Sequence, residues 1–469
     1  MLHLLLFLVA VFSFIFFILP NNQKHGKYNL PPGPKGLPLI GNLHQLDPLI
    51  RTPHISLFNL AKIYGPILSL QLGCRSTVVI QSASVAKEVL KAQDHSFCNR
   101  PAMVAYRRLS YNGLDLAFAP YNEYYTEMRK ICVVNLFSSK KVQSYAPIRR
   151  EEVSRMMQKI SSLSSASEIV NLSELVTALT SSIICRAAFG KSWLDKLSGL
   201  SSKLDRVFKD LDKFYDEIIS DHLDPNRLKD DDHHQDIVDV LLQLQKEHCF
   251  SFELTLDHIK AVLMNIILAG RDPSACMIVW AMVELMRNPM VMRKAQEELR
   301  TILQDKSFIE EEDLPKLEYF RAVVKETFRL QPTNPLLILR ETFEKCSIQG
   351  YDILPKTSLV VNVWAIGRDS KSWNQPEAFM PERFLRSPID FKGRDFELIP
   401  FGAGRRICPG MILGVATFEI ALANLLYSFD WELPSGLKKE DIDYDVVPGI
   451  AMHKKNPLCL MAKKFSPKI

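Results

Sequence analysis

Ten consecutive residues near the C-terminus carry the strongest chemical signal in the chain. They read FGAGRRICPG and occupy positions 401–410. Gly402 and Gly404 permit a tight turn that can pass close to a flat ligand. Cys408 precedes an expected helix, whose positive N-terminal end favours the thiolate over the thiol. A thiolate near backbone N–H donors is what a Cys-ligated haem iron needs, and Arg406 would pair with a haem propionate.

The other cysteines do not suggest a metal or disulfide framework. The chain has nine cysteines, an odd number, and no two of them stand at C-x-x-C spacing. Disulfide pairing and a structural zinc site are therefore poor interpretations. The ordinary expectation for each cysteine is a reduced, half-buried core residue.

The loop resembles the haem-binding loop of the cytochrome P450 family. It matches at the defining positions Phe401, Gly404, Arg406, Cys408 and Gly410. Five spaced matches favour this interpretation over a core cysteine. The resemblance implies haem b with Cys408 as the proximal ligand to iron. It also implies a mainly α fold, a single large helical domain with small β-sheets.

Two further motifs agree with this resemblance. Glu326 and Arg329 stand three residues apart, which places them on one face of a helix. Taken alone, such a pair is an ordinary surface salt bridge that contributes little stability. It resembles the family's Glu-x-x-Arg pair, and Arg383 stands in the matching downstream motif, Pro-Glu-Arg-Phe. The resemblance implies that the three form a buried structural network behind the haem.

Three more residues match family positions that contact the haem. Arg340 lies where the family places a propionate partner. Tyr125 and Arg129 occupy the positions of the family's Trp-x-x-x-Arg pair, and the resemblance implies that Arg129 is a propionate ligand. Tyr125 departs from the usual Trp, although its hydroxyl can still donate a hydrogen bond.

The long central helix departs from the family pattern at its expected catalytic step. Residues 269–274 read AGRDPS, so Pro273 stands where the family carries a hydroxyl residue. In the family the hydroxyl and its acidic neighbour deliver protons to bound dioxygen through water. Asp272 remains for this role, while Ser274 lies about 100° further round the helix and need not face the haem. Alternatively, Pro273 only sharpens a kink in the helix.

A second departure is an abrupt junction near 191–193. Relatives in the family are expected to have a whole helix and part of a loop between Gly190-Lys191 and Ser192-Trp193. That element forms the roof of the substrate pocket in the family. Its loss predicts an open distal pocket and leaves the haem loop unaffected.

The N-terminus predicts membrane attachment. Residues 1–20 are almost purely apolar and long enough to span a bilayer as a helix. No basic residue precedes this run and no small-x-small cleavage site follows it, which favours a permanent anchor over a signal peptide. Lys24 and Lys27 follow it, so the body is expected in the cytosol, at the endoplasmic reticulum membrane. Residues 21–36 form a basic, proline-rich hinge or a plain linker, and 37–469 form the haem domain.

Apolar periodicity predicts the elements that position these residues. Segments 67–72 and 78–80 read as a β-hairpin, and the segment from about 254 to 286 reads as a long buried helix closed by Asn288-Pro289. Further helices are expected at about 124–136, 142–162, 172–189, 317–330 and 409–428. The substrate is expected to meet a loop at 103–114, the central helix near Leu268 and Ala269, and the segment 333–337.

The resemblance implies a monooxygenase that transfers one oxygen atom from O2 to a small lipophilic substrate. Electrons would come from a membrane-bound NADPH–cytochrome P450 reductase. Residues 121–137 resemble the plant A-type members, in particular the subfamily that oxidises aldoximes. Two alternatives are a haem-thiolate isomerase or dehydratase that needs no O2, and a non-catalytic remnant. The net charge of +5 is small and the basic residues are scattered, so nucleic-acid binding is not expected.

Overall fold

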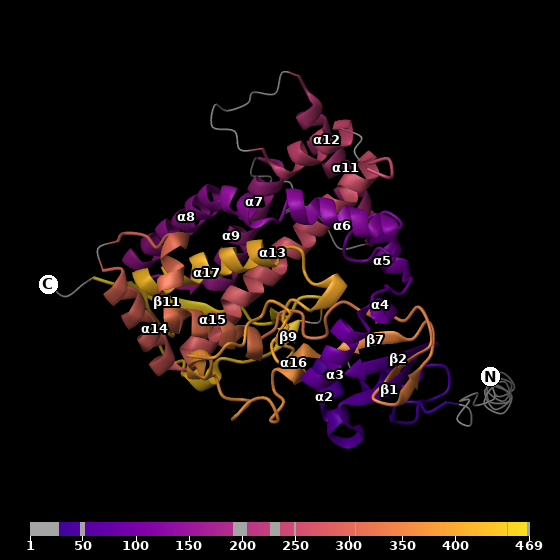
Figure 1. The fold of residues 1–469 in the computed structure, drawn as a ribbon. Coiled ribbons are helices and arrows are strands. Elements are labelled where there is room, and N and C mark those ends of the chain that lie inside the picture. Colours follow the sequence, from indigo (N-terminus) through magenta and orange to yellow (C-terminus); the bar gives the residue numbers. More distant parts are fainter. Residues whose placement is uncertain are drawn as a thin grey trace, which may run out of the picture.

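The computed structural model of the chain describes residues 28–46, 52–190, 204–225, 235–247, 250–304, 306–447 and 449–466. Helices make up most of this part and pack around the long helix α13, while the largest sheet lies beside the N-terminal elements (Figure 1). The mainly α fold with small sheets is therefore confirmed. The expected anchor at 1–20 and the first part of the expected hinge, 21–27, lie outside the described residues.

The central helix α13 (Leu256–Arg287) is the axis of the helical part. It is 32 residues long and packs against α9 (Leu172–Phe189) and α17 (Met411–Ser428). By length and apolar composition these three helices would suit a membrane span. Their apolar side chains instead fill the hydrophobic core, where Trp280 is almost completely buried. Burial of that surface is the main force that holds the domain together.

The N-terminal part is built on a four-stranded sheet with the order β1-β2-β7-β4. The hairpin of β1 (Ile67–Leu72) and β2 (Arg75–Ile80) turns at Gly73, whose φ of +60° suits glycine. β7 (Ser358–Val361) runs parallel to β2, and β4 (Arg340–Glu341) is antiparallel to β7. This pairing carries Arg340 into the core of the molecule.

The described end of the hinge is attached to this sheet. The carbonyl of Pro32 accepts a hydrogen bond of 2.8 Å from the backbone N–H of Ser69. A Cβ atom at Gly33 would lie only 1.9 Å from the Ser69 carbonyl oxygen, so glycine allows this close approach. The chain therefore enters the domain along β1.

The remaining elements complete the two parts. The other α-helices are α2 (Pro53–Tyr64), α3 (Ala83–Lys87), α4 (Asp94–Phe97), α5 (Val104–Leu109), α6 (Glu123–Asn135), α7 (Ser139–Ser144), α8 (Ala146–Ser165), α11 (Leu204–Leu223), α12 (Ile237–Glu247), α14 (Pro289–Ile302), α15 (Glu318–Leu330) and α16 (Val363–Ile366). Short 3-10 helices are η1 (Leu43–Gln45), η3 (Glu311–Lys316), η4 (Pro381–Phe384), η5 (Gly404–Arg406) and η6 (Lys439–Asp441), and η2 (Glu88–Ala92) is a π-helix. The other strands are β3 (Val170–Asn171), β5 (Cys346–Ile348), β6 (Tyr351–Ile353), β8 (Phe429–Glu432), β9 (Val446–Val447), β10 (His453–Lys454) and β11 (Cys459–Lys464).

The structure corrects some of the predicted elements. The helix expected at 142–162 is divided into α7 and α8, with Pro147 in the first turn of α8. The expected loop at 103–114 contains the helix α5. The last helix begins at Met411, so Pro409 lies before the helix and Gly410 is its N-cap. The junction near 191–193 lies outside the described residues.

Candidate haem site

Cys408 stands on a tight loop between η5 and α17. Its backbone N–H donates to the carbonyl of Phe401 at 3.0 Å, which closes the loop. Gly404 has a φ of +71°, and a Cβ there would lie 2.3 Å from the carbonyl oxygen of Leu90. The loop is therefore pressed against the N-terminal part. The ring of Phe401 packs edge-on against Phe328 of α15.

The surroundings of the Cys408 thiol act on its pKa in opposite directions. Burial raises the pKa, while the N–H of Gly410 and the positive charge of Arg129 lower it, and burial prevails. Burial of the sulfur therefore opposes the thiolate form that the haem site needs. A metal ion that binds the sulfur displaces the proton and supplies the missing stabilisation.

Three buried arginines from different segments gather beside this loop. Arg100, Arg340 and Arg406 are each less than a tenth exposed. Burial and the charges of Arg406 and Arg340 lower the pKa of Arg100 well below its usual range. Among the described residues, the buried carboxylate that contacts this group is Asp94, at 2.7 Å from Arg340. Two positive charges thus have no acidic partner within the described part of the chain, which is costly unless an anion binds.

Arg406 shows where an anion fits. Its Nε donates to the carbonyl of Cys98 at 2.8 Å and one Nη to the carbonyl of Ala119 at 2.7 Å. The other, Nη1, is buried and has no hydrogen-bond partner among the described residues. An orphaned guanidinium donor amid excess positive charge fits the two propionates of haem b.

The helix α6 supplies Tyr125 and Arg129. It is N-capped by Asn122, whose side chain accepts the N–H of Tyr125. The guanidinium of Arg406 lies 3.7 Å from the centroid of the buried Tyr125 ring, a cation–π contact. Arg129 donates to the carbonyl of Ile407 at 2.6 Å, next to Cys408. Tyr125 thus stacks on Arg406, and α6 reaches the loop of Cys408 through both of its predicted haem-site residues.

Glu326, Arg329 and Arg383 meet in the interior. Arg329 donates from Nε and Nη2 to the two carboxylate oxygens of Glu326, both at 2.7 Å. Arg383 donates to the same carboxylate at 3.1 Å. Glu326 and Arg329 have fully buried side chains. The three residues tie α15 to η4.

The middle of α13 is unusually exposed for a core helix. Residues on both sides of it are buried, yet Leu268 and Ala269 are exposed and 270–273 are partly exposed. The helix runs without interruption through Pro273, which offers no N–H to the carbonyl four residues earlier. This exposed stretch of α13 is where a cavity wall is expected.

Asp272 and Ser274 point to different neighbours. Asp272 lies 3.6 Å from the ring of His453 in β10 and 3.5 Å from Arg271. Burial acts to raise the pKa of Asp272, but the hydrogen bond and charge of His453 and the charge of Arg271 outweigh it, so the pKa is lowered. Ser274 is buried, and its Oγ lies 3.8 Å from the position that a Cβ atom would take at Gly414 of α17. The structure therefore does not bring these two side chains together.

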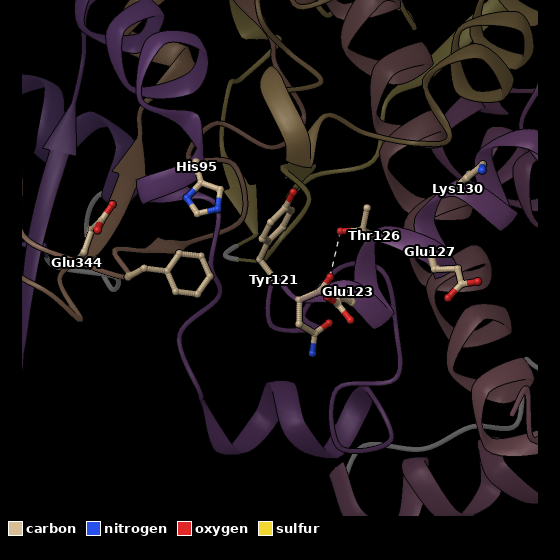
Figure 2. Close-up of a pocket in the computed structure, with 9 residues that line it drawn as sticks. His95, Tyr121, Glu123, Thr126, Glu127, Lys130 and Glu344 are labelled. Atoms are coloured by element: carbon tan, nitrogen blue, oxygen red, sulfur yellow. Dashed lines mark hydrogen bonds between the residues drawn. The ribbon is translucent and has the colours of Figure 1, made fainter. Parts of the chain in front are cut away.

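A groove of about 850 Å³ opens on the surface beside the loop (Figure 2). At one end His95, Tyr121 and Phe343 pack with ring centroids 6.1 to 6.4 Å apart. The other lining residues are Asn122, Glu123, Thr126, Glu127, Lys130 and Glu344. The hydroxyl of Tyr121 accepts a hydrogen bond of 2.8 Å from Arg405, which links the groove to the loop of Cys408.

Sequence reasoning missed Arg100 and Asp94. Both lie in a short segment without clear periodicity, and each has a partner at 338–340, more than 200 residues away. Such contacts leave no local sequence pattern. The surplus of buried positive charge, seen only in three dimensions, identifies them.

A cysteine on a tight loop, buried arginines beside it and a long central helix define a haem-thiolate protein. The chain belongs to the cytochrome P450 family: the family model named Cytochrome P450 matches residues 31–198 and 193–461. Members of this family carry haem b, and they are monooxygenases that use O2. The family, fold class, enzyme class and cofactor predicted from the sequence are thus confirmed.

Several curated plant proteins are similar over nearly their whole length. The 6,7,8-trihydroxycoumarin synthase of Pastinaca sativa is 44% identical over 505 positions, covering 98% of each chain. Strychnine-11-hydroxylase of Strychnos nux-vomica is 44% identical and covers 98% of this chain and 96% of its own. Cytochrome P450 71B35 of Arabidopsis thaliana is 43% identical, covering 97% of both. A zebra fish cytochrome P450 structure with abiraterone shows the same fold, with a TM-score of 0.77, 24% identity and coverage of 88% and 100%.

Proposed function

We propose that this chain inserts one oxygen atom from O2 into a small lipophilic plant metabolite, with electrons from NADPH–cytochrome P450 reductase. The observation that supports this proposal most strongly is the surplus of buried positive charge beside the loop of Cys408. Two similar plant proteins are named for hydroxylation of strychnine and for synthesis of a trihydroxycoumarin. Fused-ring compounds of the coumarin and strychnine kinds are therefore the first substrates to test, and aldoximes the second.

The proposed roles follow from the contacts. Haem b, when bound, supplies the activation of dioxygen. The Cys408 sulfur holds the iron, and Arg406 pairs with a propionate through its free Nη1. Arg129 from α6 and Arg340 from β4 stabilise the charge of the propionates. Arg100 adds a further buried positive charge to those of Arg340 and Arg406. These side chains orient the haem and neutralise its carboxylates.

Proton supply is the weaker part of the proposed site. The Asp272 carboxylate is half-exposed and can pass protons to water in the cavity. Pro273 offers no hydroxyl to hold that water, and Ser274 is turned towards α17. We therefore expect oxygen transfer with substantial loss of reducing equivalents as peroxide.

A segment of the fold is proposed to be missing near 191–193. The two stretches that match the family model overlap at 193–198. The alignment with the parsnip synthase spans 505 positions, although this chain has 469 residues. Both observations support a deletion relative to the family. Insertion of the corresponding segment of strychnine-11-hydroxylase should tighten binding of lipophilic ligands, measured by optical titration; unchanged affinity would contradict a missing pocket roof.

The groove beside the loop is proposed as part of the docking face for the reductase. Arg405, half-exposed, lies next to Tyr121 and belongs to the loop that carries Cys408. Phe343 is 41% exposed at the rim and offers an apolar anchor of the kind that dominates interfaces. Phe343→Ser should raise the reductase concentration needed for half-maximal reduction several-fold. Val447→Ser, at a 46% exposed position elsewhere, is the matched control.

The membrane anchor also remains a proposal. We place residues 1–20 as a single span in the endoplasmic reticulum membrane, with the haem domain in the cytosol. The composition of 1–20 supports this placement. Removal of residues 1–20 should release the expressed protein from the membrane fraction.

The test of the proposed reaction is turnover with isotopically labelled oxygen. The full chain, reconstituted with reductase, NADPH and labelled O2, should yield product that carries one labelled oxygen atom. Product without NADPH or O2 would identify an isomerase or dehydratase, which the missing hydroxyl at Pro273 would suit. A haem-loaded protein that shows no spectral change with any ligand would be a non-catalytic remnant.

A further inference from the structure

Asp94 is the first residue of α4 and lies in the interior beside the haem loop. Its side chain is 9% exposed. Oδ1 accepts a hydrogen bond of 2.7 Å from Nη1 of Arg340, and Oδ2 accepts one of 2.6 Å from the backbone N–H of Arg405. One carboxylate therefore joins β4 to the loop that carries Cys408.

The loop is shaped to receive this carboxylate. A Cβ atom at Gly404 would lie 2.6 Å from Oδ2 of Asp94, so a side chain there would expel the acid. Arg340 is held from two directions, because its Nη2 donates to the carbonyl of Ala403 at 2.8 Å. Asp94, Arg340 and residues 403–405 thus form one closed set of contacts.

The charge of Asp94 matters because the surroundings are buried and positive. Arg100, Arg340 and Arg406 lie in a medium where charges interact strongly over several ångströms. Asp94 neutralises one of the three and leaves a surplus that matches the two haem propionates. Without it, Arg340 would carry a buried charge whose remaining partner, among the residues that the structure describes, is the carbonyl of Ala403.

We propose that Asp94 is a positioning residue that aims Arg340, holds the loop of Cys408 and limits the positive charge at the propionate site. This inference rests on the proposed haem site and adds a residue to it. More positive charge near a haem stabilises the reduced form, which has one negative charge more. Asp94 therefore keeps the reduction potential of the bound haem lower than the arginines alone would set it.

The experiment uses the full-length haem-loaded protein and four variants: Asp94→Asn, Asp94→Glu, Arg340→Gln and the double variant Asp94→Asn/Arg340→Gln. The reduction potential is measured by spectroelectrochemical titration, and haem release by transfer to apomyoglobin. Asp94→Asn should shift the potential upwards and release haem several-fold faster. Arg340→Gln should shift it downwards, and the double variant should lie close to the wild type. Asp94→Glu should restore much of the wild-type behaviour.

Two outcomes would overturn the inference. One is Asp94→Asn that binds haem normally and keeps the wild-type potential. The other is Asp94→Asn that loses haem equally in the Arg340→Gln background, because Asp94 would then act without Arg340. Failure of the proposed function is distinguishable, since the wild-type protein itself would then show no thiolate-type spectrum.

Discussion

The region around Cys408 and the region around Pro273 are both organised by long apolar helices, but they hold their polar groups differently. Beside Cys408, arginines from three separate parts of the chain, Arg129, Arg340 and Arg406, donate hydrogen bonds to backbone carbonyls. Around Pro273, Asp272 is half-exposed and its partners lie 3.5 to 3.6 Å away. The first region is tied together from several sides, whereas Asp272 in the second has longer contacts with Arg271 of its own helix and with His453 of β10.

This difference shows which functions are hard to lose. A buried charged group that contacts several elements cannot be changed alone without leaving an uncompensated charge. A half-exposed acid on a helix can change with little effect on folding. We therefore expect the haem-holding side to determine stability and the oxygen side to determine efficiency.

The largest effect is expected at Glu326. Glu326→Ala leaves the buried guanidinium of Arg329 without its carboxylate, which should lower the free energy of unfolding by about 3–5 kcal/mol. Glu432→Ala removes the exposed pair with Lys463 and should cost below about 1 kcal/mol. The unfolding free energies of the two variants are measured by urea titration monitored by circular dichroism. Equal losses of unfolding free energy would contradict the contrast between buried and exposed ion pairs.

A smaller but clear effect is expected at Gly404. Gly404→Ala puts a Cβ against the Leu90 carbonyl and the Asp94 carboxylate at a positive φ. Gly436→Ala meets the same type of backbone strain at φ +89° but has open space around it. The backbone strain alone costs about 1–2 kcal/mol, and the contacts at Gly404 should add about 1–3 kcal/mol and speed haem release. Similar unfolding energies for both variants would show that the loop can move away.

On the oxygen side, changes at Pro273 should alter both the stability of α13 and the efficiency of oxygen transfer. Pro273→Thr and Pro273→Ala both restore the N–H to the ladder of α13 and should stabilise it by up to about 3 kcal/mol. Only Thr adds a hydroxyl, so only Pro273→Thr should raise the product formed per NADPH, by several-fold. Peroxide and product are measured together. An equal gain in Pro273→Ala would assign the effect to the helix and not to the hydroxyl.

The smallest effect is expected from the ionisation of Asp272. Because its pKa is lowered in the folded chain, its charged form stabilises the fold above the ordinary Asp pKa near 4, and this contribution is lost as pH falls through the folded value. The group is 39% exposed, so the contribution should stay below about 1 kcal/mol. The stability difference between wild type and Asp272→Asn should therefore be present at pH 6 and vanish towards pH 2. A stability difference that grows on acidification would contradict a lowered pKa of Asp272 in the folded chain.

Sequence patterns predicted the large elements well, for identifiable reasons. The helix of 172–189 agrees with α9, and the stop at Asn288-Pro289 marks the end of α13, because strong apolar runs and proline leave little freedom. The hairpin of β1 and β2 follows from two apolar runs around a glycine turn. In contrast, β4 has two residues, too few for any periodicity, yet it places Arg340.

The site was predicted in part. The loop of Cys408 and the contacts of Glu326 could be located because each lies in a short motif. The contact of Asp94 with Arg340 joins positions 246 apart in the chain, and the stacking of Tyr125 on Arg406 depends on packing alone. Such pairings are created by the fold, so no stretch of sequence contains them.

Ligation of the haem iron by Cys408 is tested by the carbon monoxide difference spectrum of the reduced full-length protein, measured beside a Cys408→Ala control. We expect a Soret band at the long wavelength of thiolate ligation, absent from the control. A band typical of a neutral thiol or histidine ligand, or no band, would contradict the claim that Cys408 holds a functional haem.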